Sequence, residues 1–134
     1  MTPQAWLEQF LAAHHAVAGT IHRTTAEGDL ELVAAVNIPP PVQDIVRRVP
    51  RGKGMAGLAL ERNEPVSTCN IQTDATGDVR PGAKLVGAQA GVAFPVPDDA
   101  GGVRAVVGIA YREERTILES ELAQLSAEAR QAPI

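Results

Sequence analysis

The sequence predicts an α/β (α+β) fold in which a central antiparallel sheet is accompanied by a helix near each end of the chain. Apolar side chains alternate with a period of two in residues 30–37, and a turn containing Gly28 joins this segment to residues 20–25, which together predict a β-hairpin. A second hairpin is predicted for residues 90–97 and 103–111, because a turn rich in Asp and Gly separates them. Residues 103–111 are apolar on both faces, so we expect this strand near the centre of the sheet.

The two terminal segments have the apolar spacing of amphipathic helices. Residues 3–17 carry one apolar stripe, and a last helix is predicted to start at Thr116, because Thr116 and Glu119 form a capping-box pattern. The stripes consist of Leu7, Phe10, Leu11, Ala13 and Val17 in the first helix and Leu118, Leu122, Leu125 and Ala129 in the last. We expect the two helices to pack together on one face of the sheet. Their apolar faces, and Trp6 at the border of the first, also predict a homodimer formed through the terminal helices.

Length and composition predict a single domain, 1–134, without a basic surface. A chain of 134 residues can bury an ordinary core, and its formal net charge of −4 gives no general attraction for nucleic acid or an anionic membrane. Cys69 is the only cysteine, so no internal disulfide can form. The start of the chain lacks a signal-peptide core, and no apolar run approaches the roughly 20 residues that span a bilayer. We therefore expect a cytoplasmic protein. His14 and His15 point in different directions on a helix, and no metal site is expected.

A glycine loop followed by a short helix is the central motif of the chain. Gly52, Gly54 and Gly57 spell G-x-G-x-x-G, and the helix is predicted to start near Gly54. Its first amide N–H groups have no partner within the helix, so they suit a small anion or a polar ligand edge. A dinucleotide loop would follow an apolar strand, whereas residues 46–51 contain a proline and three arginines, which disfavours that interpretation.

The segments around this motif are predicted from their local patterns. Residues 42–49 are expected to form one or two helical turns, and residues 65–71 a strand beside the pocket. The cations Arg47, Arg48, Arg51 and Lys53 either end a helix in solvent or attract an anion to the glycine loop. Residues 72–87 are polar and rich in turn formers, and a loop of that length is typical of a lid or binding segment.

This order of elements, with the residues that fill it, resembles a GAF domain. The resemblance is carried by residues 52–59, Glu64-Pro65-Val66, residues 92–96 and residues 106–110. It covers about residues 15–130 and implies a central antiparallel sheet with the N- and C-terminal helices on one face and a small-molecule pocket on the other. It also implies a GAF domain that stands alone, without an attached kinase, cyclase or DNA-binding domain.

Three branches of GAF proteins can be compared with this chain. Free methionine-(R)-sulfoxide reductase is one, but it needs a nucleophilic and a resolving thiol, and Cys69 is alone here. The cyclic-nucleotide branch has a signature that the sequence does not match. The third branch comprises small receptors for nitrate or similar anions of the NreA type, whose glycine loop and central-strand end are similar to residues 108–112 and the motif around Gly54.

The resemblance favours a non-enzymatic sensor that binds a small anion, with nitrate as one candidate, or a polar metabolite, and that signals to a separate protein. No acid–base pair is evident around the motif, so no catalytic residue and no cofactor are predicted. The candidate ligand-binding residues are Lys53, Gly54, Met55, Ala56, Gly57, Cys69, Ala93 and Tyr111. Two alternatives stay open: a reductase that uses Cys69, and a dimeric structural or interaction module without a ligand.

Overall fold

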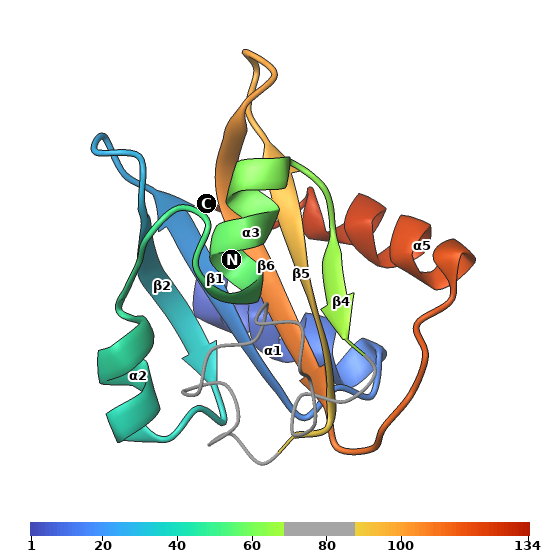
Figure 1. Ribbon diagram of the computed structural model, residues 1–134. Coiled ribbons are helices and arrows are strands. Elements are labelled where there is room, and N and C mark those ends of the chain that lie inside the picture. Colours follow the sequence, from blue (N-terminus) through green and yellow to red (C-terminus); the bar gives the residue numbers. More distant parts are fainter. Residues whose placement is uncertain (69–87) are drawn as a thin grey trace.

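The computed structural model describes residues 1–68 and 88–134, and these form one curled antiparallel sheet with helices on both faces (Figure 1). In chain order the elements are α1 (Pro3–Ala13), β1 (Ala18–Thr24), β2 (Leu30–Val36), α2 (Pro40–Val46), β3 (Arg48–Val49), α3 (Gly54–Arg62), β4 (Val66–Thr68), β5 (Ala90–Pro97), β6 (Val103–Tyr111) and α5 (Glu119–Ala129). Within the described residues the six strands lie in the order β3-β2-β1-β6-β5-β4, and all neighbours are antiparallel. The predicted fold class and both hairpins are confirmed.

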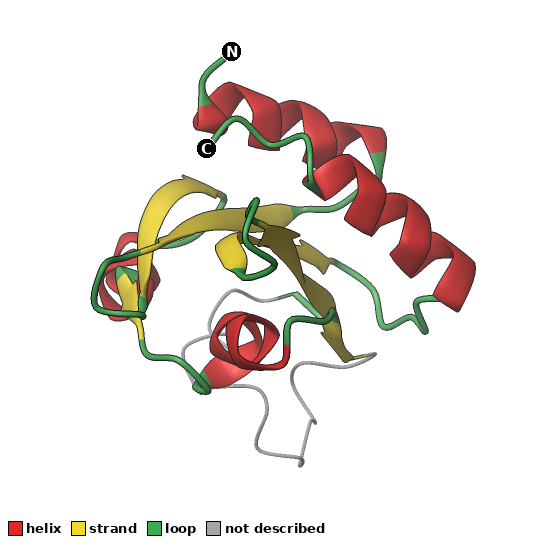
Figure 2. Cartoon of the chain, turned by 90° about the horizontal axis from the view of Figure 1, so that it is seen from above, coloured by secondary structure: helices red, strands yellow, loops and turns green. Residues whose placement is uncertain are grey.

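The two faces of the sheet bear different helices. Figure 2 shows α1 and α5 side by side on one face and α3 on the other, and Val42 of α2 packs with Ala18 and Ala35. Alternation along the strands separates the two sets of side chains, because successive residues of a strand point to opposite faces. The core beneath α1 and α5 takes Val92, Phe94 and Val96 from β5 and Val107, Ile109 and Tyr111 from β6.

The terminal helices bury their apolar stripes within this chain. Leu7 of α1 and Ala129 of α5 have no exposed surface and share one core with the sheet. His14 Nε2 lies 2.8 Å from Glu128 Oε1, so a polar contact also joins the two helices. Trp6 is half-buried and stacks on Phe10 with the ring centroids 4.8 Å apart. The homodimer stays a prediction. Most of the two stripes is covered within the chain, so Trp6 and Leu118, which keeps 59% of its surface exposed, are the residues that still support it.

Three helix boundaries differ from the sequence prediction. The first helix ends at Ala13, because His15 adopts a left-handed φ of 59° and the Val17 N–H donates to the Ala110 carbonyl at 2.9 Å, which begins the sheet. Residues 42–49 divide into the end of α2 and the short strand β3.

None of the described helices is long and apolar enough to cross a membrane.

The start of the last helix is the third difference. Its N-cap is Leu118 rather than Thr116, although a leucine side chain has no hydrogen-bond acceptor. The Glu121 carboxylate accepts the Leu118 N–H at 3.4 Å and also pairs with Arg115, so the reciprocal half of a capping box forms two residues later than expected. The acidic residue that decides the boundary is therefore Glu121, and not Glu119.

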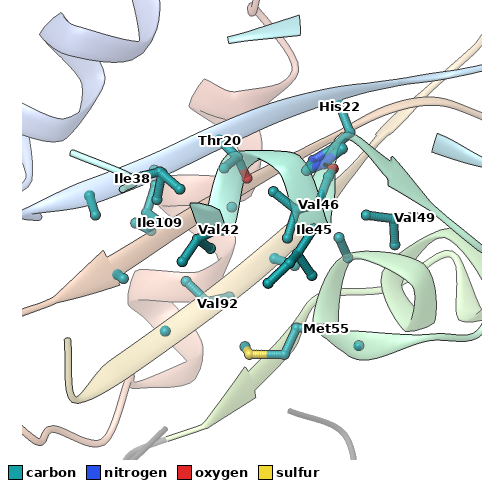
Figure 3. Close-up of a pocket in the computed structure, with 18 of the residues that line it drawn as sticks. Thr20, His22, Ile38, Val42, Ile45, Val46, Val49, Met55, Val92 and Ile109 are labelled. Carbon is teal, nitrogen blue, oxygen red and sulfur yellow. Dashed lines mark hydrogen bonds between the residues drawn. The ribbon is translucent and has the colours of Figure 1, made fainter. Parts of the chain in front are cut away.

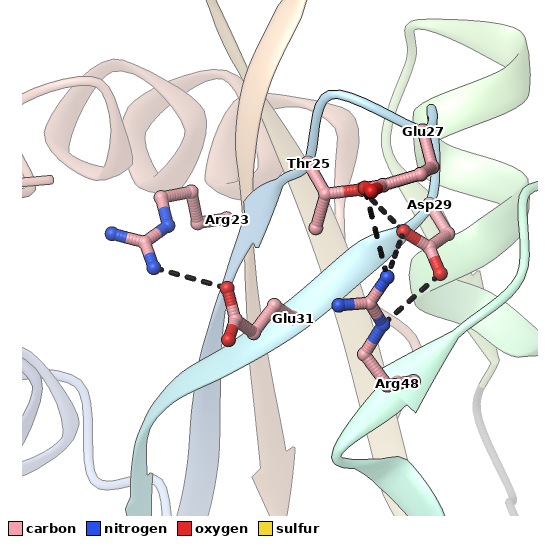
Figure 4. A network of polar contacts seen from close by, with 6 residues as sticks. All are labelled: Arg23, Thr25, Glu27, Asp29, Glu31 and Arg48. Carbon is pink, nitrogen blue, oxygen red and sulfur yellow. Dashed lines mark hydrogen bonds and ion pairs between the residues drawn. The ribbon is translucent and has the colours of Figure 1, made fainter.

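A polar network fixes the edge strand β3 to the first hairpin (Figure 4). The Arg48 guanidinium donates to both carboxylate oxygens of Asp29, at 3.0 and 3.1 Å, and lies 3.8 Å from Glu27. A hydrogen bond from the Thr25 hydroxyl, together with Arg48, holds the pKa of the Asp29 carboxyl below its usual value. This network places residues 50–53, which lead into α3, next to the sheet.

Candidate functional site

A cavity of about 160 Å³ lies between the sheet and helices α2 and α3, on the face opposite α1 and α5 (Figure 3). It is of the size that holds a small aromatic ring, since an apolar protein cavity of about 150 Å³ admits benzene. Its lining residues are Ala18, Gly19, Thr20, His22, Ile38, Val42, Ile45, Val46, Val49, Lys53, Gly54, Met55, Ala56, Gly91, Val92, Ala93, Gly108, Ile109 and Ala110. Most of these side chains are apolar, and the cavity therefore suits a ligand with an apolar body.

The floor of the cavity is open because small residues meet across three neighbouring strands. In the sheet register Ala110 of β6 faces Ala18 of β1 on one side and Gly91 of β5 on the other. Gly108 lies opposite Thr20, and a Cβ atom added there would come within 3.1 Å of the Thr20 hydroxyl oxygen. Larger side chains at these positions would fill the space that the cavity now occupies.

Apolar side chains of α2 and α3 form the walls. Val42 is buried against the sheet, whereas Ile45 keeps 44% of its surface exposed although it lines the cavity. Met55 lies at the start of α3, across the cavity from these two residues (Figure 3). An exposed isoleucine on the wall shows that the cavity is only partly covered by the described residues.

The three glycines of the central motif are required for two different structural reasons. Gly52 and Gly54 have φ values of 81° and 68°, a left-handed conformation that favours glycine. Gly57 allows α3 to approach the preceding turn, because an added Cβ would lie 2.5 Å from the Pro50 carbonyl oxygen and 3.2 Å from the Gly52 nitrogen. The motif builds a tight turn into α3, as the sequence predicts, and its third glycine serves packing.

The N-terminus of α3 presents free amides to the cavity. The Gly57 N–H already donates to the Lys53 carbonyl at 3.1 Å, whereas the structure gives no hydrogen bond from the N–H groups of Gly54, Met55 or Ala56 within its described part. These three residues line the cavity. Free amides at a helix N-terminus favour an anionic or carbonyl oxygen.

Positive charge near the cavity is smaller than the sequence suggests. Arg47 pairs with Asp44 at 2.8 Å and Arg48 with Asp29, so both guanidinium groups are compensated by carboxylates. Lys53 lines the cavity, and the described residues contain no ion pair for it. Arg51 does not line the cavity, so among these four cations only Lys53 is placed to attract an anion into this site.

His22 is a functional candidate that sequence reasoning missed. The side chain is 3% exposed, lines the cavity, and its Nε2–H donates to the Val46 carbonyl at 2.8 Å. Because a carbonyl can only accept, this bond fixes the tautomer and leaves Nδ1 as an acceptor, which has no hydrogen-bond partner among the described residues. Burial lowers the pKa of His22, and the bond to Val46 opposes this only in part, so the ring is neutral at pH 7.

The sequence contains a weak signal that His22 lies at the cavity. Ala18, Thr20 and His22 share one face of β1, whereas Ile21 points to the core beneath the terminal helices. This alternation could have placed His22 beside the small residues of the pocket. The register between β1 and β6, which decides the contact, is not visible in the sequence.

The structure brings most of the predicted site residues together. Lys53, Gly54, Met55, Ala56 and Ala93 line the cavity. Gly57 packs against the preceding turn, and Tyr111 lies in the core of the opposite face, where the Arg115 guanidinium covers its ring at 4.5 Å from the centroid. Cys69 and the expected lid, residues 72–87, lie outside the described residues.

The described part of the cavity wall carries three polar or charged side chains. Thr20, His22 and Lys53 are the polar or charged side chains on the cavity wall, and no hydrogen bond joins any two of them within the described residues. An activated nucleophile or an acid–base pair requires such a contact or a partner within reach. The described residues also contain no group of three or more His, Cys, Asp or Glu that could hold a metal ion.

Comparisons with known proteins agree on the fold. No protein-family model and no curated protein matches this sequence. Among solved structures, a GAF domain region from Geobacter sulfurreducens superposes with a TM-score of 0.79 at 14% identity, covering 96% of this chain and 86% of that one. The GAF domain of an Acinetobacter phosphoenolpyruvate-protein phosphotransferase gives 0.73 at 18% identity, covering 98% and 82%.

A second kind of neighbour is an enzyme. The type II free methionine-R-sulfoxide reductase from Thermoplasma acidophilum superposes with a TM-score of 0.74 at 18% identity, covering 94% of this chain and 83% of that one. The class of protein is thereby defined at the level of architecture. This chain has a GAF-like fold, as the residues around the glycine motif predict.

Proposed function

We propose that this GAF-like domain is a non-enzymatic sensor that binds a small organic ligand in the cavity between the sheet and helices α2 and α3. The observation that carries the proposal is an apolar cavity of about 160 Å³ lined by the first three residues of α3, whose amides have no hydrogen-bond partner among the described residues. The ligand places an apolar body against the floor and walls and an anionic or carbonyl oxygen at the amides of Gly54, Met55 and Ala56. A separate protein reads the occupied state.

The lining favours an organic ligand over a bare inorganic anion. A nitrate ion would lose its hydration in a space lined by Ile38, Val42 and Val46, and among the described residues Lys53 is the one cation on the wall. A small carboxylate meets the same amides with its oxygens and contributes an apolar body that gains from burial. Nitrate nevertheless belongs in the test, because the free amides alone would also attract it.

The proposal is tested with small carboxylates, nitrate and methionine sulfoxide in a thermal-shift screen followed by calorimetry. A ligand at 100 times its dissociation constant adds about 2.7 kcal/mol to the free energy of unfolding. Ala110→Leu adds three carbon atoms to the cavity floor and is expected to abolish binding. Ala123→Leu makes the same change at an exposed site on α5 and is expected to retain it. Equal binding by both variants would place any ligand outside this cavity, and no binding by any compound would contradict the sensor.

A reductase is the second candidate, and the similarity to solved free methionine-R-sulfoxide reductases is the observation that favours it. In that reaction a thiolate takes the sulfoxide oxygen to become a sulfenic acid, the substrate leaves as a thioether, and a second thiol reduces the sulfenic acid to a disulfide. Cys69 is the only thiol of this chain, so the resolving thiol must come from another molecule. Turnover of free methionine-R-sulfoxide with a thioredoxin system, lost in Cys69→Ser, would support the enzyme and overturn the non-enzymatic proposal.

A further inference from the structure

The buried imidazole of His22 supplies a second polar contact at the cavity. It lies on β1 at the side of the cavity where α2 ends, beside Val46, with Thr20 two residues earlier on the same strand face (Figure 3). Its Nε2–H is committed to the Val46 carbonyl. Its Nδ1 lone pair has no partner among the described residues, and this atom is buried.

An unpartnered acceptor of this kind is uncommon in folded proteins. Leaving a buried acceptor without a hydrogen bond costs roughly 1–3 kcal/mol, and most such groups are satisfied by protein or by a bound molecule. The Thr20 hydroxyl, which also lines the cavity, makes no hydrogen bond within the described residues. The other surroundings are apolar: Val42, Val46 and Val49 offer no side-chain donor to His22. None of the described residues supplies a donor to Nδ1, and because His22 lines the cavity, a bound ligand can supply it.

We propose that His22 selects ligands that carry a hydrogen-bond donor, an N–H or O–H group, on their apolar body, and that His22 Nδ1 accepts this hydrogen bond. The inference rests on the proposed function and defines its ligand class further. The ligand then has two polar ends of opposite kind: an oxygen acceptor held by the amides of α3 and a donor held by His22. A ligand of the same shape without the donor binds less tightly, because it leaves Nδ1 unsatisfied.

Isosteric pairs of small heterocycles test this directly. Pyrrole and furan have the same ring size, but only pyrrole has an N–H donor, and the 2- and 3-carboxylates of the two rings add an oxygen anion for the α3 amides. We expect each pyrrole to bind roughly tenfold more tightly than its furan partner, the ratio that one net hydrogen bond of about 1.4 kcal/mol supplies. Affinities are measured by calorimetry or by protein-detected NMR titration.

One substitution distinguishes the roles of the two ring nitrogens of His22, and a second serves as its control. His22→Gln places an amide N–H near the position of Nε2, so it keeps a donor for Val46 and removes the Nδ1 acceptor. It is expected to abolish the preference for pyrroles, so that each pyrrole binds no more tightly than its furan partner. His15→Gln makes the same change at an exposed histidine and is expected to keep the preference. A further measurement uses the wild-type protein and so does not depend on the folding of a variant. In it, the ¹⁵N resonance of His22 Nδ1 is expected to shift on binding a pyrrole but not on binding a furan.

The outcomes distinguish this inference from the proposed function. If pyrroles and furans bind equally well and the Nδ1 resonance does not respond, the cavity binds ligands but His22 does not select them, and the inference is wrong. If no member of the three pairs binds, both the inference and the proposed ligand cavity are contradicted. A preference that persists in His22→Gln would assign the selection to another group, such as the Thr20 hydroxyl, and would overturn the role of His22.

Discussion

Substitution of Gly57 by alanine sets helix propensity against packing. Alanine is normally better than glycine inside a helix by about 0.8–1.0 kcal/mol, so propensity alone predicts that Gly57→Ala stabilises α3. The structure predicts the opposite, because the new Cβ would lie 2.5 Å from the Pro50 carbonyl oxygen and 3.2 Å from the Gly52 nitrogen. Both atoms belong to the backbone, and neither can rotate out of the way as a side chain can.

The size of the effect follows from what must move. The turn before α3 is closed by hydrogen bonds from the Gly52 N–H to the Gly57 carbonyl at 2.9 Å and from the Lys53 N–H to the Pro50 carbonyl at 3.1 Å. Overpacking costs about 1–3 kcal/mol, and a weakened backbone hydrogen bond adds about 1 kcal/mol, which offsets the gain in helix propensity. We therefore expect a net loss of about 1–3 kcal/mol, or roughly 4 °C in melting temperature for each kcal/mol in a domain of this size.

Chemical denaturation of Gly57→Ala and Ala56→Gly compares the contributions of helix propensity and of packing to the free energy of unfolding. Helix propensity alone predicts opposite signs for these neighbouring substitutions, whereas the packing argument predicts that both lower the stability. Displacement of the turn should also weaken any ligand that contacts the α3 amides. An increase in the melting temperature of Gly57→Ala would refute the packing argument.

Three further predictions concern groups described above. Burial lowers the pKa of His22 below its usual 6.5, so the unfolded chain binds a proton more readily than the folded one. The contribution of neutral His22 to stability is therefore present above pH 6.5 and falls as the pH drops below it, by at most about 1.4 kcal/mol per pH unit. Urea titrations at pH 7 and 5.5 should show this loss in the wild type but not in His22→Gln. Arg48→Gln removes a positive partner of Asp29 and should raise the pKa of that carboxyl towards its usual value in an NMR titration, whereas Arg47→Gln should leave it unchanged. Light scattering at micromolar concentration tests the homodimer: a dimer that Trp6→Ala dissociates would support the terminal-helix interface, and a monomer would contradict it.

Sequence reasoning succeeded where one local pattern determines the structure. The period of two in residues 30–37 and the glycine turns predict the hairpins, because each strand must bury one face. Gly54 and Asn63 mark the two ends of α3, since a left-handed φ of 68° at the first and 52° at the second suits these residue types. These signals need no knowledge of distant segments.

Prediction failed where two local signals compete or where contacts are distant in sequence. Glu119 and Glu121 both offer a carboxylate to a helix start, and the pairing of Glu121 with Arg115 decides between them. Tyr111 ends a strand whose neighbours line the cavity, but it lies three positions after Gly108, and this odd offset puts it on the opposite face. The cavity role of His22 depends on the strand register and on the position of Val46, neither of which the sequence gives.

The alternation of side chains along β6 makes the volume of the cavity independent of the packing of the core. Gly108 and Ala110 face the cavity, whereas Val107 packs under the terminal helices. A change of volume on the cavity side therefore leaves the packed core on the other side in place. New ligand sizes become accessible through single substitutions of small residues, each tolerated by the same scaffold. A sheet with one filled and one partly open face can in this way diversify its recognition while its architecture remains constant.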